Sequence, residues 1–344
     1  MLKIKNISRG QIVSWIFSKI PISILGGLTR TNLIIPYYHV VSDEKILHVY
    51  HLYKYKNRSQ FIEDLDFLQK KYSPITLHDL LNSIKTESPL PKNSFLLTFD
   101  DGFREMYDIV APILQKKGIS ATFFINTAFI DNKTLCYEHK ASILIEYLLK
   151  KKSFGLEKRI KEIFKKNNIP FKNIKSSMLS IKYQQKEVID DIAELLDVDF
   201  NEYLWKYKPY LTTSQIMRLI KDGFTIGAHS IDHPLYSTLS LEDQRYQTLE
   251  SVKKLIDDFN LDYGAFAFPY TDSGVSELFF SNISDIGLVD VSFGTGGLVK
   301  DHFPRNIQRL SLEKPLMPAS RIIALQFARK IFRILQGKDK IIRN

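Results

Sequence analysis

Two shortages in the sequence exclude whole classes of protein. The 344 residues include a single cysteine, Cys136, which rules out an internal disulfide framework and any cysteine-based zinc site, and which is typical of a reducing compartment. No run approaches the roughly 18 consecutive apolar residues that a membrane-spanning helix needs. The chain is 44% hydrophobic and 25% charged, close to the globular average. We therefore expect a folded protein in the cytoplasm.

An apolar stretch near the N-terminus, residues 12–28, offers a second interpretation of the location. Lys19 and Pro21 interrupt this stretch, and no small-residue cleavage site follows it. These features are not those of a cleavable signal peptide. The alternative is an uncleaved anchor, which would place the rest of the chain outside the cytoplasm.

The basic residues give a formal net charge of +10, and their excess lies in three peripheral segments. Residues 1–30 hold five Lys or Arg and no acid, residues 150–175 hold ten against two acids, and residues 321–344 hold seven against one. Because a nucleic-acid enzyme usually places positive charge around its site, we expect no nucleic-acid partner. Peripheral contact with an anionic membrane surface accounts better for the distribution.

Short apolar runs alternate with stretches of helical periodicity along most of the chain. Alternation of this kind predicts parallel β/α units, and so many units favour a barrel or a doubly wound sheet. The capping pairs Thr76–Asp79, Thr212–Gln215 and Ser240–Asp243 mark the starts of three helices. We expect strands in residues 32–41, 95–99, 121–126, 224–229 and 263–270, with 287–293 and 306–312 as further candidates.

The pattern divides the chain into three parts. Residues 1–31 form a basic and apolar N-terminal segment, residues 32–315 the main domain, and residues 316–344 a basic amphipathic helix. A Lys-rich stretch at about 133–210 is expected to be a helical insertion in the main domain. The apolar face of the C-terminal helix, which carries Ile323 and Phe327, either docks on the barrel or lies on anionic lipid.

Acids and histidines fall where the expected strands end. Asp100 and Asp101 follow one strand, and His229 and His233 follow another. Two histidines four residues apart can face one metal ion with a carboxylate as third ligand, which leaves an open position for catalysis. The second carboxylate is then free to take a proton from water. The alternative is that the aspartates cap the next helix and the histidines lie on a solvated loop.

Three motifs carry a family resemblance. Residues 98–102 read Thr-Phe-Asp-Asp-Gly, residues 229–233 read His-Ser-Ile-Asp-His, and residues 266–270 read Phe-Ala-Phe-Pro-Tyr. In this order they resemble the polysaccharide deacetylase (NodB-homology) family, and the similarity covers about residues 33–312. The resemblance implies a distorted (β/α) barrel and hydrolysis of an N-acetyl group on a hexosamine, within a glycan or a lipid-linked sugar.

The resemblance also implies roles for single residues. Asp101, His229 and His233 would hold a divalent ion, Zn²⁺ first and Co²⁺ or Ni²⁺ as alternatives. Asp100 would be the general base, and the backbone N–H of Tyr270 would help to hold the oxyanion.

Two departures from the family pattern concern the groups around Asp100. Many relatives have an arginine in the third motif, where this chain has Ala265 and Ala267. Arg309 is a candidate substitute, with a surface or helix-terminal role as the alternative. The C-terminal Leu-x-His motif is also missing, because residues 306–313 contain no histidine.

An N-terminal histidine offers a replacement for the missing one. His39 stands in the run Tyr-Tyr-His-Val-Val, residues 37–41, which resembles the opening of the biofilm poly-N-acetylglucosamine deacetylases. In that subset an N-terminal histidine serves as the acid, a task that suits imidazole near neutral pH. The alternative is a core histidine bonded to a carbonyl.

The same motifs are also compatible with other functions. The enzyme would then remove a formyl group from a lipid-linked aminosugar, or an O-acetyl group from a polysaccharide. An inactive glycan-binding protein is a third interpretation, favoured by the two departures and opposed by the intact acids and histidines.

Overall fold

A computed structural model describes residues 17, 19–151 and 154–343. Most of the basic N-terminal segment, including the first part of the apolar stretch, therefore lies outside the described residues. Among the helices that are described, none combines the length and the apolar character needed to cross a bilayer.

The centre of the molecule is a single sheet of eight parallel strands in the order β11-β9-β8-β7-β6-β5-β2-β12. The two edge strands, β11 and β12, are separated in sequence by Arg309 alone, so the sheet curls into a nearly closed barrel. The expected distorted (β/α) barrel is confirmed. The strands are β2 (Pro36–Tyr38), β5 (Leu97–Phe99), β6 (Ala121–Ile125), β7 (Thr225–Ala228), β8 (Ala265–Ala267), β9 (Val291–Gly294), β11 (Asn306–Gln308) and β12 (Leu310–Ser311).

Two of the expected strands are each divided between two sheets. β1 (Leu33–Ile34) and β4 (Ser94–Phe95) pair with each other and, through β4, with β3 (Ser73–Pro74). The chain then passes through Ile35 and Leu96 before β2 and β5 enter the barrel. Periodicity does not reveal this division because both halves of each run are apolar. A further two-stranded sheet joins β10 (Lys300–Asp301) to β13 (Lys340–Ile341).

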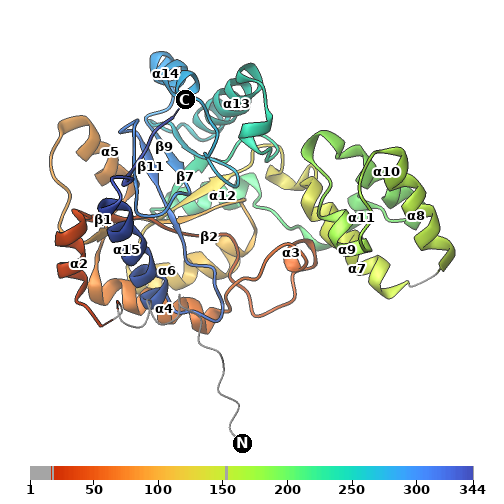
Figure 1. Ribbon diagram of the computed structural model, residues 1–344, viewed down its shortest axis with the longest axis horizontal. Coiled ribbons are helices and arrows are strands. Elements are labelled where there is room, and N and C mark those ends of the chain that lie inside the picture. Colours follow the sequence, from red (N-terminus) through yellow and green to blue (C-terminus); the bar gives the residue numbers. More distant parts are fainter. Residues whose placement is uncertain (1–16, 18, 152–153, 344) are drawn as a thin grey trace, which may run out of the picture.

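Helices surround the barrel (Figure 1). Thr76 and Thr212 form the expected capping boxes, and the Ser240 hydroxyl accepts a hydrogen bond from the Asp243 N–H. The helices of the barrel are α3 (Leu47–Tyr50), α4 (Arg58–Lys71), α5 (Leu77–Thr86), a π-helical turn (Met106–Val110) that leads into α6 (Ala111–Lys117), α12 (Thr213–Lys221), α13 (Leu241–Phe259) and α14 (Glu277–Ile286), with 3₁₀ turns at Ile130–Asn132 and Tyr236–Thr238.

Between β6 and β7 the chain forms a separate helical lobe, seen at the right of Figure 1. The lobe has its own hydrophobic core, with Leu144, Ile160 and Ile189 fully buried. Its elements are α7 (Tyr137–Lys150), α8 (Phe154–Lys166), α9 (Ile174–Met178), a 3₁₀ turn (Tyr183–Gln185), α10 (Glu187–Leu196) and α11 (Phe200–Tyr207).

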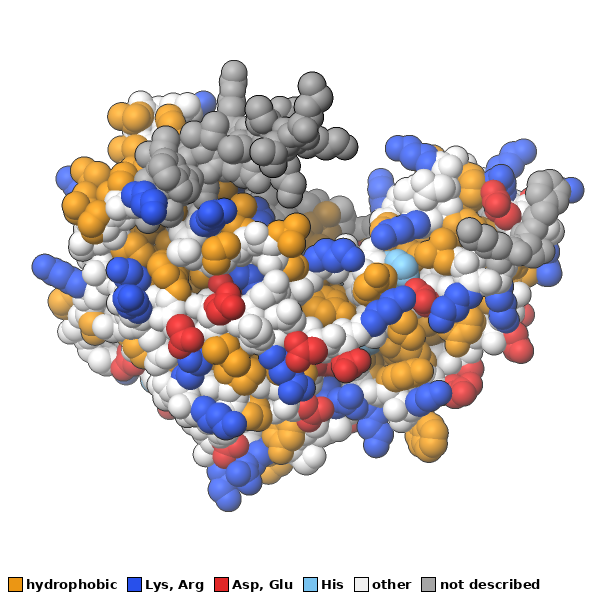
Figure 2. Space-filling model, turned by 90° about the horizontal axis from the view of Figure 1, so that it is seen from below, with side chains coloured by type: hydrophobic (Ala, Val, Ile, Leu, Met, Phe, Trp, Pro, Cys, Tyr) orange, Lys and Arg blue, Asp and Glu red, His pale blue; other side chains and the backbone are white. Residues whose placement is uncertain are grey.

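The C-terminal helix α15 (Ala319–Leu335) packs against α2 (Ile22–Thr29) and α4. Ile323 and Phe327 are buried there, so this part of the apolar face docks on the main domain. In Figure 2 the Lys and Arg side chains are spread over the face seen from below, among acidic and hydrophobic ones. Among the described residues, that face shows no continuous basic band.

Candidate active site

Local backbone geometry directs the two aspartates into the mouth of the barrel. β5 ends at Phe99, and Asp101 and Gly102 follow with φ values of 76° and 66°, in the left-handed region. A Cβ on Gly102 would also come within 3.0 Å of the Ile125 side chain, so the position favours glycine. His229 follows β7, which lies beside β6 in the same sheet. The carboxyl ends of parallel strands meet at one face of a barrel, and the motifs therefore converge.

Asp101, His229 and His233 lie together as the spacing suggested. Asp101 Oδ1 is 3.5 Å from His229 Nε2 and 3.3 Å from His233 Nε2. Ligands about 2.05 Å from a tetrahedral zinc ion are separated by roughly 3.3 Å. The buried Asp101 Oδ1 has no hydrogen-bond partner among the described residues, and such an atom is costly unless something binds it. The three residues thus fit a divalent ion, and their role as ligands stays a prediction.

The remaining nitrogen of His229 has a partner that prepares the ring for an ion. His229 Nδ1 lies 2.8 Å from the carbonyl oxygen of Ala267 in β8. Because a carbonyl only accepts, the proton resides on Nδ1 and the lone pair on Nε2. This Nε2 is the atom that faces Asp101.

Asp100 is held by Arg309 in a bidentate ion pair. Nη1 donates to Oδ1 at 2.6 Å and Nη2 to Oδ2 at 2.8 Å. Both residues are buried, with 2% of Asp100 and none of Arg309 exposed. Burial raises the pKa of Asp100, but the charge and hydrogen bonds of Arg309, together with the charges of His229 and His39, more than offset this and hold the pKa below its usual value. Arg309 therefore replaces the motif arginine, and the surface alternative is wrong.

His39 is held by a residue that sequence analysis missed. Its Nδ1 lies 2.5 Å from Glu313 Oε2, and Glu313 Oε1 accepts the backbone N–H groups of His39 and Val40. Burial lowers the pKa of His39, but the charge and hydrogen bond of Glu313, with smaller contributions from Asp101 and Asp100, outweigh this effect and raise the pKa to about 9. One feature of the sequence could have identified Glu313 as a site residue. It lies at the end of residues 306–313, where the family pattern has a histidine.

Tyr270 lies beside the triad in the loop after β8. Its ring centroid is 4.5 Å from that of His233, and its hydroxyl is 3.3 Å from the Tyr137 hydroxyl at the start of α7. The φ of Tyr270 is 55°. Its backbone N–H donates to no acceptor recorded among the described residues, so this N–H is available for a ligand.

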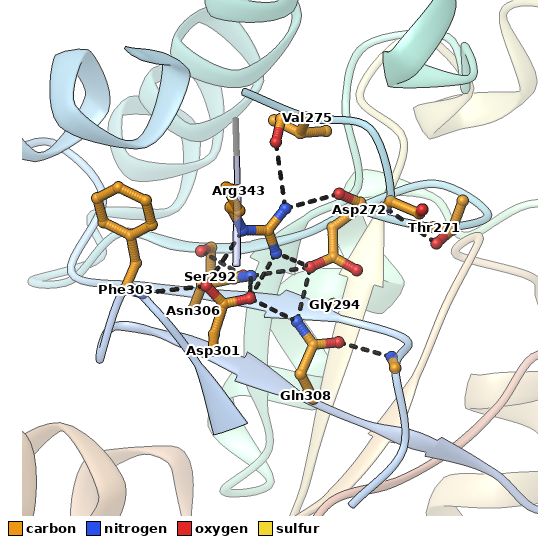
Figure 3. Close-up of polar contacts among 12 residues, drawn as sticks. Thr271, Asp272, Val275, Ser292, Gly294, Asp301, Phe303, Asn306, Gln308 and Arg343 are labelled. Carbon is orange, nitrogen blue, oxygen red and sulfur yellow. Dashed lines mark hydrogen bonds and ion pairs between the residues drawn. The ribbon is translucent and has the colours of Figure 1, made fainter. Parts of the chain in front are cut away.

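The loop that carries Tyr270 is fixed by the C-terminal end of the chain (Figure 3). Arg343 Nη2 contacts both Asp272 and Asp301, and Arg343 Nη1 donates to the Asp272 carbonyl at 2.8 Å. Gln308 Nε2 also donates to both carboxylates, at 2.6 and 3.0 Å. A Cβ on Gly294 would come 2.4 Å from the Asp272 carboxylate, so Gly294 makes room for this network.

Cys136 and Glu138 lie behind His233. The thiol, the carboxylate and a His233 ring nitrogen offer ligand atoms within 4.8 Å of one another. Glu138 Oε2 is 4.0 Å from His233 Nδ1, too far for a hydrogen bond. Sequence analysis assigned these two residues no part in the site, since the helical lobe shows no motif.

Comparisons with known proteins agree with the motifs. A family model described as polysaccharide deacetylase matches residues 87–288, more than half of the chain. No curated protein sequence matches the chain.

Two solved structures share the fold at low sequence identity. They are the Streptococcus pyogenes deacetylase PplD in complex with acetate, at 14% identity and a TM-score of 0.54, and IcaB from Ammonifex degensii, at 16% and 0.52. The similarity covers 86% and 87% of this chain, and 97% of each of the other two. The chain belongs to the polysaccharide deacetylase family, as its three motifs predicted.

Proposed function

We propose that the chain is a metal-dependent hydrolase that removes N-acetyl groups from a glycan or lipid-linked sugar containing N-acetylhexosamine. The observation that carries the proposal is the buried pair of Asp100 and Arg309 next to the cluster of Asp101, His229 and His233. A pure binding protein needs neither a charged base held in place nor an unpartnered carboxylate oxygen. The family match and the fold shared with the deacetylase PplD support the same proposal.

Asp101, His229 and His233 are the residues that would hold the ion, with Zn²⁺ the expected metal and Co²⁺ or Ni²⁺ as alternatives. A divalent ion in this position supplies Lewis acidity, which polarises the amide carbonyl and makes water more acidic. The choice of Zn²⁺ rests on the two nitrogen ligands, which it favours more than Mg²⁺ or Ca²⁺ do.

Asp100 would act as general base. Its low pKa keeps the carboxylate ionised at neutral pH. Arg309 occupies one lone pair on each oxygen, and a carboxylate has about four such sites, so Asp100 can still accept a proton from the attacking water. The water oxygen then forms the bond to the amide carbon.

His39 would act as general acid. Glu313 keeps the imidazole protonated at neutral pH through its negative charge and its contact with Nδ1. The opposite nitrogen, Nε2, would deliver its proton to the sugar nitrogen as the C–N bond breaks. The products are acetate and a free amine, and the Tyr270 N–H would stabilise the charge on the former carbonyl oxygen.

Acetate release from N-acetylglucosamine oligomers tests this function. We expect Asp100→Asn to lower kcat/KM by roughly 10²–10⁴-fold, the usual contribution of a general base. Asp285→Asn, an exposed aspartate in α14, is the control and should leave the rate unchanged. Unchanged turnover in Asp100→Asn, or oligomer binding with no turnover in the Zn²⁺-loaded protein, would contradict the proposal.

Mass spectrometry of the product distinguishes the related reactions. Loss of acetyl and loss of formyl change the substrate mass by different amounts, and the site of the lost group separates N- from O-deacetylation. We propose a cytoplasmic location with peripheral membrane contact and no nucleic-acid partner, because the residues assigned to the reaction lie outside the three basic segments of the sequence.

A further inference from the structure

A pocket of about 570 Å³ lies on the side of the barrel where α2, α15 and the small β10–β13 sheet meet. Four Lys or Arg residues from separate parts of the chain line it: Arg30 directly after α2, Lys300 in β10, Lys330 in α15 and Lys340 in β13. None of the residues assigned to the reaction lines this pocket. It is therefore separate from the candidate active site.

Lys330 is the buried member of the group, with 5% of its surface exposed. Its ammonium donates to the Thr31 hydroxyl at 2.7 Å, the one acceptor recorded for it among the described residues. An ammonium has three N–H donors, so the Thr31 hydroxyl satisfies one of them. A buried charge without an opposite partner is costly, so an anion bound next to Lys330 would be stabilising.

The other three basic side chains bring no carboxylate partner into the pocket. Among the described residues, Arg30, Lys300 and Lys340 form no recorded ion pair with a carboxylate. Burial and, to a smaller extent, the nearby charge of Lys300 lower the pKa of Lys330, Asp339 raises it, and the result is a pKa of about 8. Lys300 and Lys330 line the same pocket, so both can act on one ligand bound there.

The acidic residues near the pocket are too few to neutralise it. Asp301 lines the wall, but its carboxylate is held by Arg343, Asn306 and Gln308. Asp339, next to Lys340 in the chain, makes no recorded ion pair with any of the four cations. The pocket therefore keeps an excess of positive charge in a partly enclosed space.

We propose that this pocket binds a phosphate group, as a free phosphate ester or as the headgroup of an anionic lipid. A phosphate monoester carries a charge of about −1.5 to −2 at pH 7 and three strong acceptor oxygens. That charge suits several ammonium groups on separate elements, and lysine binds phosphate as a point charge. A single carboxylate would leave more of the positive charge unbalanced.

The first test is thermal unfolding of the full chain in sodium phosphate against sodium chloride at equal ionic strength. A ligand that binds only the folded state raises Tm in a saturable way, and we expect this rise with phosphate alone. Lys330→Met should raise Tm in chloride, because it removes a buried cation, and should abolish the additional rise in phosphate. Lys300→Met should fold normally and weaken phosphate binding at least tenfold, whereas the exposed Lys221→Met in α12 should bind phosphate as the parent does.

The second test identifies the source of the phosphate. Sedimentation with vesicles that contain phosphatidic acid, whose headgroup is a phosphate monoester, is compared with sedimentation with phosphatidylcholine vesicles and is repeated with added inorganic phosphate. If the protein binds the vesicles, and if both the Lys300→Met substitution and added phosphate weaken this binding, the ligand is a lipid headgroup. Saturable phosphate binding without any vesicle binding indicates a soluble phosphate ester. Equal Tm in phosphate and chloride, or unchanged phosphate binding in both Lys300→Met and Lys330→Met, would overturn the proposal.

Discussion

Arg309 stands between the last two strands of the barrel and binds Asp100, which lies 209 positions earlier in the sequence. Its backbone N–H donates to Gly294 in β9, while the next residue, Leu310, donates to Ile35 before β2. The residue that bridges the two edges of the sheet is thus also the one that holds the proposed base. Barrel closure and orientation of Asp100 are therefore linked through a single side chain.

Replacing Arg309 tests this link through stability. In Arg309→Met the buried Asp100 charge loses its partner, and we expect the free energy of unfolding to fall by about 3–5 kcal/mol. Urea unfolding followed by circular dichroism measures the change. The control is Arg218→Met, which removes an exposed pair with Asp222 and should change stability by less than about 1 kcal/mol. Equal stability of Arg309→Met and the parent would show that the pair is not formed.

Glu313 sets the pH range of activity if His39 is the acid. His39 must be protonated to act, so activity should fall as pH rises through its pKa, which Glu313 raises to about 9. In Glu313→Gln the charge that favours imidazolium is gone, the pKa of His39 falls, and the basic limb of the kcat/KM profile should move to lower pH. The control Glu44→Gln changes an exposed carboxylate and should leave the profile unchanged. A basic limb that stays in place in Glu313→Gln would exclude the proposed role of His39.

Metal content depends on Asp101, His229 and His233 in this account. We expect about one divalent ion per chain in the parent, and a large loss of that ion in His229→Ala and Asp101→Ala. Elemental analysis of dialysed protein measures this without relying on activity. His302→Ala removes a half-exposed histidine elsewhere and serves as the control. Full metal occupancy in both site variants would refute the assignment of ligands.

Arg343 should affect turnover without touching the ion. It fixes Asp272, two residues after Tyr270, and so holds the loop whose N–H is proposed to bind the oxyanion. We expect Arg343→Met to lower kcat about tenfold, with KM and metal content little changed, since one misplaced donor costs catalysis rather than binding. Arg329→Met, on the exposed side of α15, is the comparison. Normal kcat in Arg343→Met would show that the loop keeps its position without the C-terminal end.

The sequence predicted the parts of the site that local motifs define. Asp100, Asp101, His229 and His233 each follow a strand whose apolar run is visible in the sequence, and parallel topology brings strand ends together. The three helix starts were predicted for a similar reason, because each capping pair lies within four residues.

The rest of the site depends on contacts between distant residues. His39 and Glu313 are 274 positions apart, and no local pattern marks either Glu313 or Arg343 as part of the site. The sequence left the role of Arg309 open between a partner for Asp100 and a surface or helix-terminal residue, because an arginine in a late strand can face inward or outward. The division of residues 94–99 between two sheets was missed since each half is equally apolar.

Anomalous diffraction at the zinc edge, from crystals grown with Zn²⁺, tests the central claim most directly. The account predicts one strong peak within about 2.3 Å of Asp101 Oδ1, His229 Nε2 and His233 Nε2 together, with Asp100 outside bonding distance and still held by Arg309. A peak bound by other residues, or no peak in this cluster, would contradict the account.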